Sequence, residues 1–290
     1  MSLNLGPGFH AITMDEYRYG PCNVPELSAS TAKLIASRSV AHAWDRHPKG
    51  GRRREPPTER MTNGTILDSL LLGGDAELIE SPHEEYRTKE AKEWKAGVLA
   101  LGKVPIKAKE LDAAKAAAEK IKQRLAREGV VLDGVNQQTA IWDEEGGVRC
   151  KARFDHWKRN DLTIYDLKIV DNAHPESVTR KIVDFGYDIQ AAAYTRAVET
   201  LIPEAAGRVR FIFLFCEDSS PHEPLVRPLA GSMRALGEFR WGRAVAAWGE
   251  ALKTRHFPGY YGCENGIEAK PHHLAMMEEA IAGGSSAIPF

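Results

Sequence analysis

The stretch LTIYDLKIV, residues 162–170, decides the fold of this chain. Read as a β-strand, it alternates, so that Leu167 lies on one face while Asp166 and Lys168 lie on the other. Of the four acid–x–lysine triplets in the chain, only this one falls on an expected strand. An apolar strand normally excludes charged side chains, because burying an unpaired charge costs several kcal/mol. Asp166 and Lys168 therefore either pair with each other or hold a bound group.

An acidic side chain on the preceding strand favours the bound group. KARFDHW, residues 151–157, reads as a strand followed by the short turn KRND, which places Asp155 close to Asp166 on the neighbouring strand. Two facing carboxylates repel unless a cation lies between them, and such oxygen ligands suit magnesium or manganese. In that arrangement Lys168 holds or activates the attacking water and neutralises developing charge. The alternative is a structural salt bridge between Lys168 and Asp166 or Asp155.

Composition sets broad limits on the function. The chain has 290 residues, of which 43% are hydrophobic, enough for one large domain or two modest ones. Its 39 basic and 40 acidic residues give a net charge of −1, which does not indicate a strongly basic nucleic-acid binder. Local basic clusters nevertheless suffice for phosphate contacts, the alternative being a solvated loop and helix face. The cluster residues that we assign to DNA binding are Arg52, Arg53, Arg54, Arg87 and Lys89.

Targeting and cofactor signals are weak. No apolar run approaches the roughly 18 residues of a membrane span, and the first residues do not resemble a signal peptide, so we expect a cytoplasmic protein without membrane contact. We identify no motif for an organic cofactor. The cysteines lie far apart without a CxxC pair, which predicts reduced thiols rather than a zinc site or disulfides. They are Cys22, Cys150, Cys216 and Cys263.

The first half of the chain is mainly helical in pattern. Residues 28–47 predict one helix, capped by Ser28 or Ser30. A short apolar helix is expected over residues 65–74, and residues 106–128 form the clearest helix in the chain.

The second half predicts a sheet covered by helices. Period-2 or β-rich patterns mark three strands that form a meander, and a helix, a fourth strand and a last helix follow. The segments are residues 137–142, 148–157, 162–170, 188–201, 209–215 and 239–253. Strands and helices in this order predict an α/β fold with a mixed sheet.

These residues resemble the PD-(D/E)XK nuclease superfamily. Asp155 and the D-L-K triplet of residues 166–168 follow a meander and precede a helix that carries Gln190 and Tyr194. YDIQAAAY is similar to the Q-x-x-x-Y signature of the RecB-like and phage-exonuclease branch, and the i, i+4 spacing places both side chains on one helical face. Such a pair also fits simple packing. The resemblance implies a restriction-endonuclease-like core, a central mixed β-sheet flanked by helices.

The resemblance extends upstream to a phosphate contact. Residues 26–44 resemble the amino-terminal helix of RecE-type (exonuclease VIII) and lambda-type exonucleases, in which a serine helps hold the 5′ phosphate. Ser30 is the matching position, and we assign Ser28 and Lys33 to the same DNA contact. A helix N-terminus is a natural phosphate seat, because its N–H groups lack helical partners. The alternative is that Ser28 and Ser30 only cap their helix.

A metal site is implied by the same resemblance. Residues 63–74 are similar to the G-T-x-x-H-x-L-L-L segment of RecE-type nucleases, but Asp68 replaces the histidine, which either preserves metal binding through an oxygen ligand or signals lost activity. Relatives often carry a glutamate where Gln137 and Gln138 stand. The implied cofactor is Mg²⁺, with Mn²⁺ as a substitute. The implied ligands are Asp68, Asp155, Asp166 and the main-chain oxygen of Leu167.

The resemblance therefore implies a phage-type, magnesium-dependent 5′→3′ exonuclease that converts double-stranded DNA ends into 3′ overhangs for recombination. The catalytic residues that it implies are Asp155, Asp166, Lys168, Gln190 and Tyr194. A homo-oligomeric ring and a single-strand annealing protein are its implied partners. The alternatives are a structure-specific or single-strand DNA endonuclease of the same fold, and a catalytically silent DNA-binding scaffold.

We expect one nuclease domain over residues 1–290. Its helical amino-terminal part covers residues 25–128, and the catalytic sheet with its last helix covers residues 135–260. Residues 266–290 are expected to form a loose tail.

Overall fold

The computed structural model describes residues 3–51, 59–73, 77–260, 266 and 268–282. Predicted DNA contacts Arg52, Arg53 and Arg54 lie outside the described residues, as does Cys263. The other three cysteines are buried free thiols, as predicted. Within the described ranges no helix combines the length and apolar character needed to cross a membrane.

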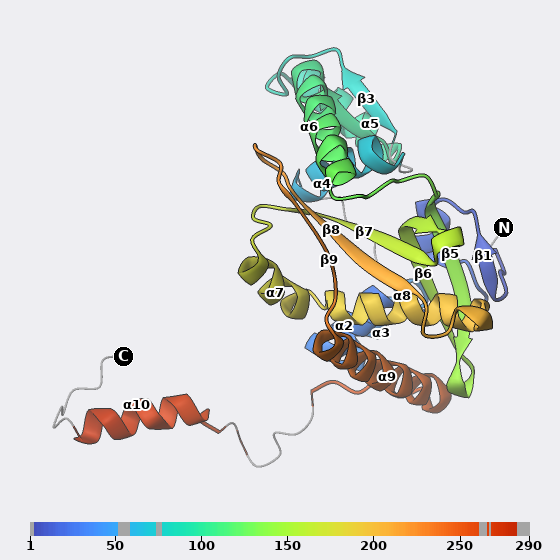
Figure 1. Ribbon diagram of the computed structural model, residues 1–290, viewed down its shortest axis with the longest axis vertical. Coiled ribbons are helices and arrows are strands. Elements are labelled where there is room, and N and C mark those ends of the chain that lie inside the picture. Colours follow the sequence, from blue (N-terminus) through green and yellow to red (C-terminus); the bar gives the residue numbers. More distant parts are fainter. Residues whose placement is uncertain (1–2, 52–58, 74–76, 261–265, 267, 283–290) are drawn as a thin grey trace.

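A seven-stranded mixed sheet forms the centre of the molecule (Figure 1), with the order β1-β5-β6-β7-β8-β9 and with β2 paired to β6. The β5–β6–β7 meander is antiparallel, β7 and β8 are parallel, and β9 closes the sheet antiparallel to β8. The meander and β8 confirm the predicted strands. The strands are β1 (Gly8–His10), β2 (Leu27–Ser28), β5 (Val135–Glu144), β6 (Val148–Lys158), β7 (Thr163–Val170), β8 (Arg210–Glu217) and β9 (Pro224–Pro228).

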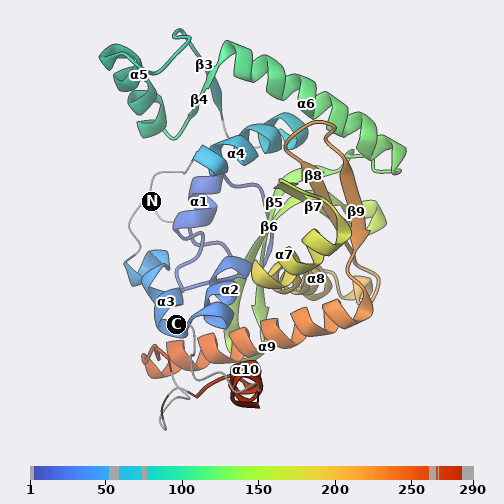
Figure 2. The ribbon, with the colours of Figure 1, turned by 90° about the vertical axis from the view of Figure 1, so that its left-hand side faces the viewer.

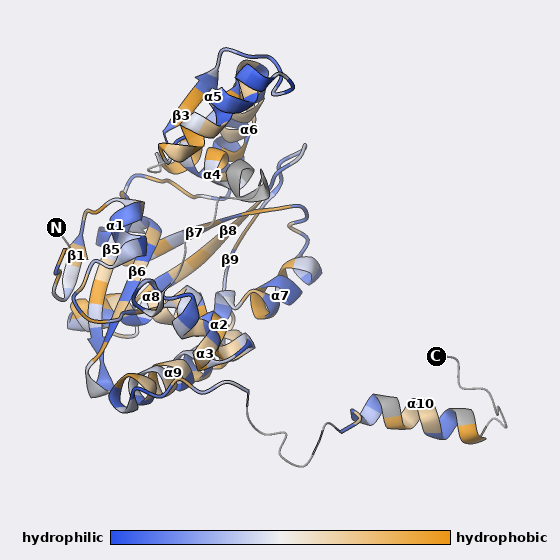
Figure 3. Cartoon of the chain, turned by 180° about the vertical axis from the view of Figure 1, so that it is seen from behind, coloured by the Kyte–Doolittle hydropathy of each residue, from blue (hydrophilic) through white to orange (hydrophobic). Residues whose placement is uncertain are grey.

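Helices cover both faces of this sheet, and α6 and α9 lie on opposite sides of it (Figures 1 and 2). One apolar cluster joins the strands to α2 (Ala29–Ser37), α3 (Val40–Asp45), α7 (Pro175–Asp184), α8 (Tyr187–Leu201) and α9 (Gly231–Thr254). A second cluster joins β7 and β8 to α4 (Glu59–Leu72) and α6 (Ala108–Arg127). Figure 3 shows hydrophobic residues along β5 and β6, between the helical layers. The alternation of β7 follows from this arrangement, because Leu167 joins the second cluster while Ile164 joins the first.

Smaller elements surround the core. The strands β3 (Leu78–Ser81) and β4 (Val104–Lys107) pair in parallel and are linked by α5 (Lys89–Ala100). The helix α1 (Met14–Tyr19) precedes β2, and α10 (Pro271–Ala282) lies apart from the sheet in Figure 1. Single 3₁₀ turns cover Pro48–Gly50, Glu145–Gly147, Arg159–Asp161 and Pro203–Ala205.

The predicted single helix over residues 28–47 is wrong, because the structure divides it into α2 and α3. The chain leaves helical geometry at Arg38, with φ −135° and ψ −96°. Ser39 then starts a new helix, since its side chain accepts the His42 N–H at 3.3 Å. A serine at this position competes with continued helix by capping the next one.

Candidate active site

The sheet opens between β6 and β7. Their pairing covers three residue pairs and stops at His156 and Tyr165, one position before Asp155 and Asp166 would face each other. Farther along, the same edge of β6 pairs with β2, beginning at Lys151. Among the described residues no strand pairs with this edge over the four positions between, which span about 13 Å. This opening, which we call the fork, therefore exposes the predicted acidic pair to the elements packed around it.

Asp155 lies where the two strands separate. Its Oδ2 accepts the backbone N–H of Leu167 at 2.9 Å, so the side chain replaces a missing ladder hydrogen bond. Burial and the neighbouring Asp166 carboxylate raise the pKa of Asp155 well above its usual value, and Asp68 adds to this effect while Lys168 opposes it. The predicted repulsion between the two carboxylates is thus present in the fold.

Asp166 is fully buried and is held by two side chains. Nε2 of Gln190 donates to its Oδ1 at 2.6 Å, and Nζ of Lys168 donates to its Oδ2. The Lys168 ammonium also lies 5.0 Å from the centroid of the Tyr187 ring. Burial alone would lower the pKa of Lys168, but the charges of Asp166 and Asp155 outweigh it and raise that pKa. Lys168 is therefore a cation beside the acidic pair, and the salt bridge weighed as an alternative is formed.

The helix α8 brings Gln190 and Tyr194 to this site. The Tyr194 ring packs 5.2 Å from the ring of Phe154 and 5.9 Å from that of Phe211, measured between centroids. Burial raises the pKa of Tyr194 well above its usual value, so the phenol stays neutral. Gln190 is the member of the pair that donates to the carboxylate, while Tyr194 supports the helix against the sheet.

Asp68 is linked to the meander through Gln137. Nε2 of Gln137 donates to Oδ2 of Asp68 at 3.3 Å, and Nε of Arg153 donates to Oε1 of Gln137 at 3.1 Å. Gln137 has φ 55°, a left-handed conformation that costs roughly 1–2 kcal/mol for a residue with a side chain. A glutamine suits this position because its amide both donates to a carboxylate and accepts from a guanidinium, whereas a glutamate lacks the donor. The second glutamine, Gln138, bonds the His10 carbonyl oxygen at 2.7 Å instead.

The donor set fits a hard divalent cation. The buried carboxylate of Asp166 and the half-buried carboxylate of Asp155 face the fork, and burial together with the Asp166 charge raises the pKa of Asp155. Over the described residues, no group of three or more His, Cys, Asp or Glu side chains stands close enough to hold a metal ion. Asp155 and Asp166 are the acidic side chains that come together at the fork. The ligand roles of Asp68 and of the Leu167 carbonyl oxygen stay predictions.

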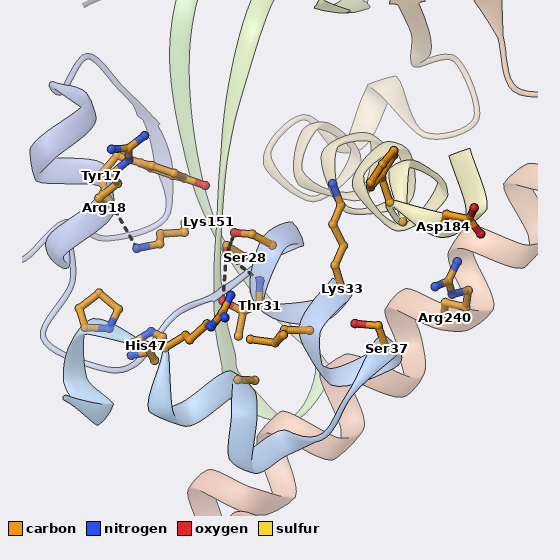
Figure 4. Close-up of a pocket in the computed structure, with 17 residues that line it drawn as sticks. Tyr17, Arg18, Ser28, Thr31, Lys33, Ser37, His47, Lys151, Asp184 and Arg240 are labelled. Carbon is orange, nitrogen blue, oxygen red and sulfur yellow. Dashed lines mark hydrogen bonds between the residues drawn. The ribbon is translucent and has the colours of Figure 1, made fainter. Parts of the chain in front are cut away.

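A basic pocket of about 390 Å³ lies at the start of α2 (Figure 4). Ser28 caps this helix, because its Oγ accepts the Thr31 N–H at 3.2 Å. Ser30 is exposed and lines the pocket, with its Oγ 3.0 Å from that of Ser28. The capping alternative therefore describes Ser28, and Ser30 is available to a ligand.

Positive charge dominates this pocket. The lining includes five basic side chains and one acidic side chain, which are Arg18, Lys33, Arg46, Lys151, Arg240 and Asp184. Arg240 is already paired with the buried Asp188, at 2.9 and 2.8 Å. Burial and the charge of Lys168 lower the pKa of Lys33 to about 7, against smaller opposing effects of Asp166 and Asp188. The surplus of cations makes the pocket a candidate anion site.

A buried acid lies beneath the pocket. Oε1 of Glu26 accepts the Cys22 N–H at 2.8 Å, and its Oε2 lies 3.7 Å from both Nε2 of His47 and Nζ of Lys151. Burial would raise the pKa of Glu26, but His47, Lys151 and the Cys22 N–H together lower it to about 2. Glu26 is therefore ionised at neutral pH and holds Lys151 in the pocket wall.

Arg87 and Lys89, both predicted DNA contacts, are not part of the basic pocket. Arg87 precedes α5 and Lys89 opens it, and the exposed Lys89 pairs with Glu93 at 3.8 Å. The sequence patterns did not lead us to predict Arg18, Arg46 or Lys151 as pocket residues, although Lys151 alternates with buried apolar residues in β6.

Comparisons with known proteins concern the family and the fold of the chain. A family model described as a PDDEXK-like domain of unknown function (DUF3799) matches residues 28–264. The crystal structure of a candidate exonuclease from Eubacterium rectale matches with a TM-score of 0.57 and 17% identity, over 96% of this chain and 100% of that chain. A phage-related exonuclease from Haemophilus somnus 129PT gives a TM-score of 0.35 and 11% identity, over 80% of this chain and 96% of that chain. No curated protein sequence matches significantly.

At 17% identity the first likeness concerns the fold alone. It confirms the predicted α/β architecture, a restriction-endonuclease-like core in which helices flank a central mixed sheet.

Proposed function

We propose that this chain, which belongs to the family of PDDEXK-like domains, is a magnesium-dependent 5′→3′ exonuclease. Its substrates would be double-stranded DNA ends. Membership in this family supports a nuclease that uses a divalent metal ion. The observation that carries the proposal is the fork, where Asp155, Asp166 and Lys168 converge beside a basic pocket. The finer assignments, 3′ overhangs and a role in recombination, rest on the sequence resemblance.

The acidic pair would hold the metal ion, with Asp68 and the Leu167 carbonyl oxygen as further ligands. When bound, the ion supplies Lewis-acid polarisation of the scissile phosphate and a water molecule of lowered pKa. Lys168 places a positive charge where negative charge develops on the phosphate. The Gln190 amide holds the Asp166 carboxylate in one orientation at 2.6 Å.

The basic pocket would hold the terminal 5′ phosphate of the strand that is cut. Ser30 offers an exposed hydroxyl, and Arg18 and Arg46 are exposed cations in the same wall. Phosphate bound there would fix the polarity of digestion, because it places the next phosphodiester at the fork. Elements from residues 25–128 and from residues 135–260 both contribute side chains, which supports a single nuclease domain.

Cleavage of linear and circular duplex DNA tests this proposal. The wild-type chain is expected to shorten a linear duplex in magnesium, to release label from its 5′ end first, and to leave a closed circle intact. EDTA should stop the reaction. Asp166→Asn should be inactive, while Asp45→Asn, which changes an exposed aspartate of α3, should cut at the wild-type rate.

The other outcomes separate the alternatives. Cutting of the circle, or of single-stranded loops alone, would identify an endonuclease of the same fold. DNA binding without cleavage in magnesium or manganese would identify a silent scaffold and would contradict the nuclease proposal.

A further inference from the structure

Lys33 stands between the basic pocket and the fork. Its side chain lines the pocket and rises from α2 toward α8 (Figure 4). Nζ of Lys33 donates to Oε1 of Gln190 at 3.1 Å, and Nε2 of the same amide donates to Oδ1 of Asp166 at 2.6 Å. One glutamine side chain therefore connects a pocket lysine to the buried carboxylate.

A glycine leaves room for the Lys33 side chain. Gly186, at the start of α8, has φ +61°, and a Cβ placed there would lie 2.8 Å from Cγ of Lys33. The Lys33 ammonium ends 5.0 Å from the centroid of the Tyr187 ring, at the same distance as the Lys168 ammonium. Two lysine side chains thus approach one aromatic ring. Lys168 bonds Asp166 directly, and Lys33 bonds the Gln190 amide that holds Asp166.

We propose that Lys33 is a positioning residue that couples an anion in the basic pocket to Asp166 through the Gln190 amide. An anion beside Lys33 favours its cationic form and fixes Nζ. A fixed cation on Oε1 polarises the amide, which strengthens the donation from Nε2 to the carboxylate, because hydrogen bonds in a chain reinforce one another. Occupancy of the pocket then strengthens the hydrogen bond that orients the Asp166 carboxylate at the fork.

This inference rests on the proposed function, because it takes the anion to be the terminal phosphate. Such coupling would disfavour cutting inside a duplex, since the Gln190 hydrogen bond to Asp166 would be strongest when a DNA end is bound. Coupling of this kind between two sites typically changes an affinity or a population by about 5- to 150-fold.

Cleavage rates on duplexes that differ only in the 5′ end, phosphate or hydroxyl, measure the coupling. We expect wild-type kcat to be about tenfold higher on 5′-phosphorylated than on 5′-hydroxyl duplexes. Lys33→Met keeps the aliphatic stem and removes the ammonium, and should reduce this ratio to less than about twofold. Lys33→Arg should restore part of the ratio. Lys49→Met, at an exposed lysine outside the pocket lining, should keep all of it.

This experiment separates failure of the Lys33 coupling from failure of the proposed terminal-phosphate site. A Lys33→Met ratio equal to that of the wild type would overturn the coupling and leave the proposed nuclease standing. A wild-type enzyme that cuts both substrates at one rate would contradict the terminal-phosphate pocket itself, and the coupling with it.

A second readout does not depend on cleavage. Titration of inorganic phosphate without metal should shift the ¹⁵N–¹H side-chain resonances of Gln190, identified by their loss in Gln190→Leu. Lys33→Met should abolish that shift and Lys49→Met should preserve it. Unchanged Gln190 resonances in the wild type at saturating phosphate would reject the coupling.

Discussion

Glu26→Gln removes the only charge of a buried acid without changing its shape. The wild-type carboxylate is inaccessible to solvent and lies 3.7 Å from both His47 and Lys151, two residues of the basic pocket. The glutamine keeps an oxygen for the Cys22 N–H but leaves Lys151 without its counter-charge. Removing one partner of a buried ion pair commonly costs about 3–5 kcal/mol.

The pKa of Glu26 gives an independent magnitude. It lies at about 2 instead of the usual 4.5, and one pKa unit corresponds to about 1.4 kcal/mol, so ionised Glu26 stabilises the fold by about 3 kcal/mol at pH 7. Because the folded pKa is the lower one, this stabilisation is fully present above about pH 5 and is lost as the pH falls toward 2. About 2 kcal/mol of it should remain at pH 3.5.

Urea unfolding of both chains at pH 7 and pH 3.5 measures the effect. The free energy of unfolding of Glu26→Gln should be lower than that of the wild type by about 3 kcal/mol at pH 7, and the difference should narrow by about 1 kcal/mol at pH 3.5. Glu84→Gln, at an exposed glutamate, serves as the control and should change stability by about 0.5 kcal/mol or less. Equal stability of Glu26→Gln and wild type at pH 7, or a difference that widens in acid, would show that ionised Glu26 does not stabilise the fold.

Four further predictions concern the fork and the core. Asp155→Asn should abolish cleavage without lowering the thermal midpoint of the metal-free protein, because it neutralises an acid whose pKa is raised by burial and by the nearby like charge. Cleavage at the wild-type rate would exclude Asp155 from the site. Lys168→Ala should lower kcat by about a hundredfold or more while Mn²⁺ binding by calorimetry is kept, whereas joint loss of both would make the lysine structural. In a magnesium titration, Asp68→Ala should lose cleavage activity that a high magnesium concentration partly restores, and Asp68→His should keep part of the activity. An Asp68→Ala titration curve that superimposes on that of the wild type would show that Asp68 is not a ligand. Gly237→Ala should lower the free energy of unfolding in urea by about 2 kcal/mol or more, since its Cβ would lie 2.3 Å from a carbonyl oxygen of α8. The control Gly242→Ala, in the same helix, places a Cβ with nothing within 4 Å and should leave stability unchanged or raise it.

The acidic pair could be predicted because the local sequence determines it. Strong period-2 patterns mark β6 and β7, and the short turn between them fixes their register. Continued by one position beyond the observed pairs, that register sets Asp155 opposite Asp166. The i, i+4 spacing likewise predicts that Gln190 and Tyr194 share the face of α8 that packs on the sheet.

The fork and the pocket could not be predicted, because distant segments create them. β6 loses β7 as a partner and gains the two-residue strand β2, a long-range pairing with no local signal. The pocket collects Arg18 from α1, Lys151 from β6 and Arg240 from α9, which are adjacent only in the fold. The role of Gln137 was equally hidden, since its left-handed backbone and its bond to Asp68 depend on Arg153.

Anomalous diffraction from crystals grown with manganese would locate a metal ion at the fork directly. We predict a peak at the fork within coordination distance of both Asp155 and Asp166, with the Lys168 ammonium moved off Oδ2 of Asp166. Asp68 would lie within about 2.0–2.2 Å of the peak if it completes the site. Crystals saturated with manganese that show no peak at the fork, and in which Lys168 remains paired with Asp166, would contradict a metal-dependent nuclease at this position.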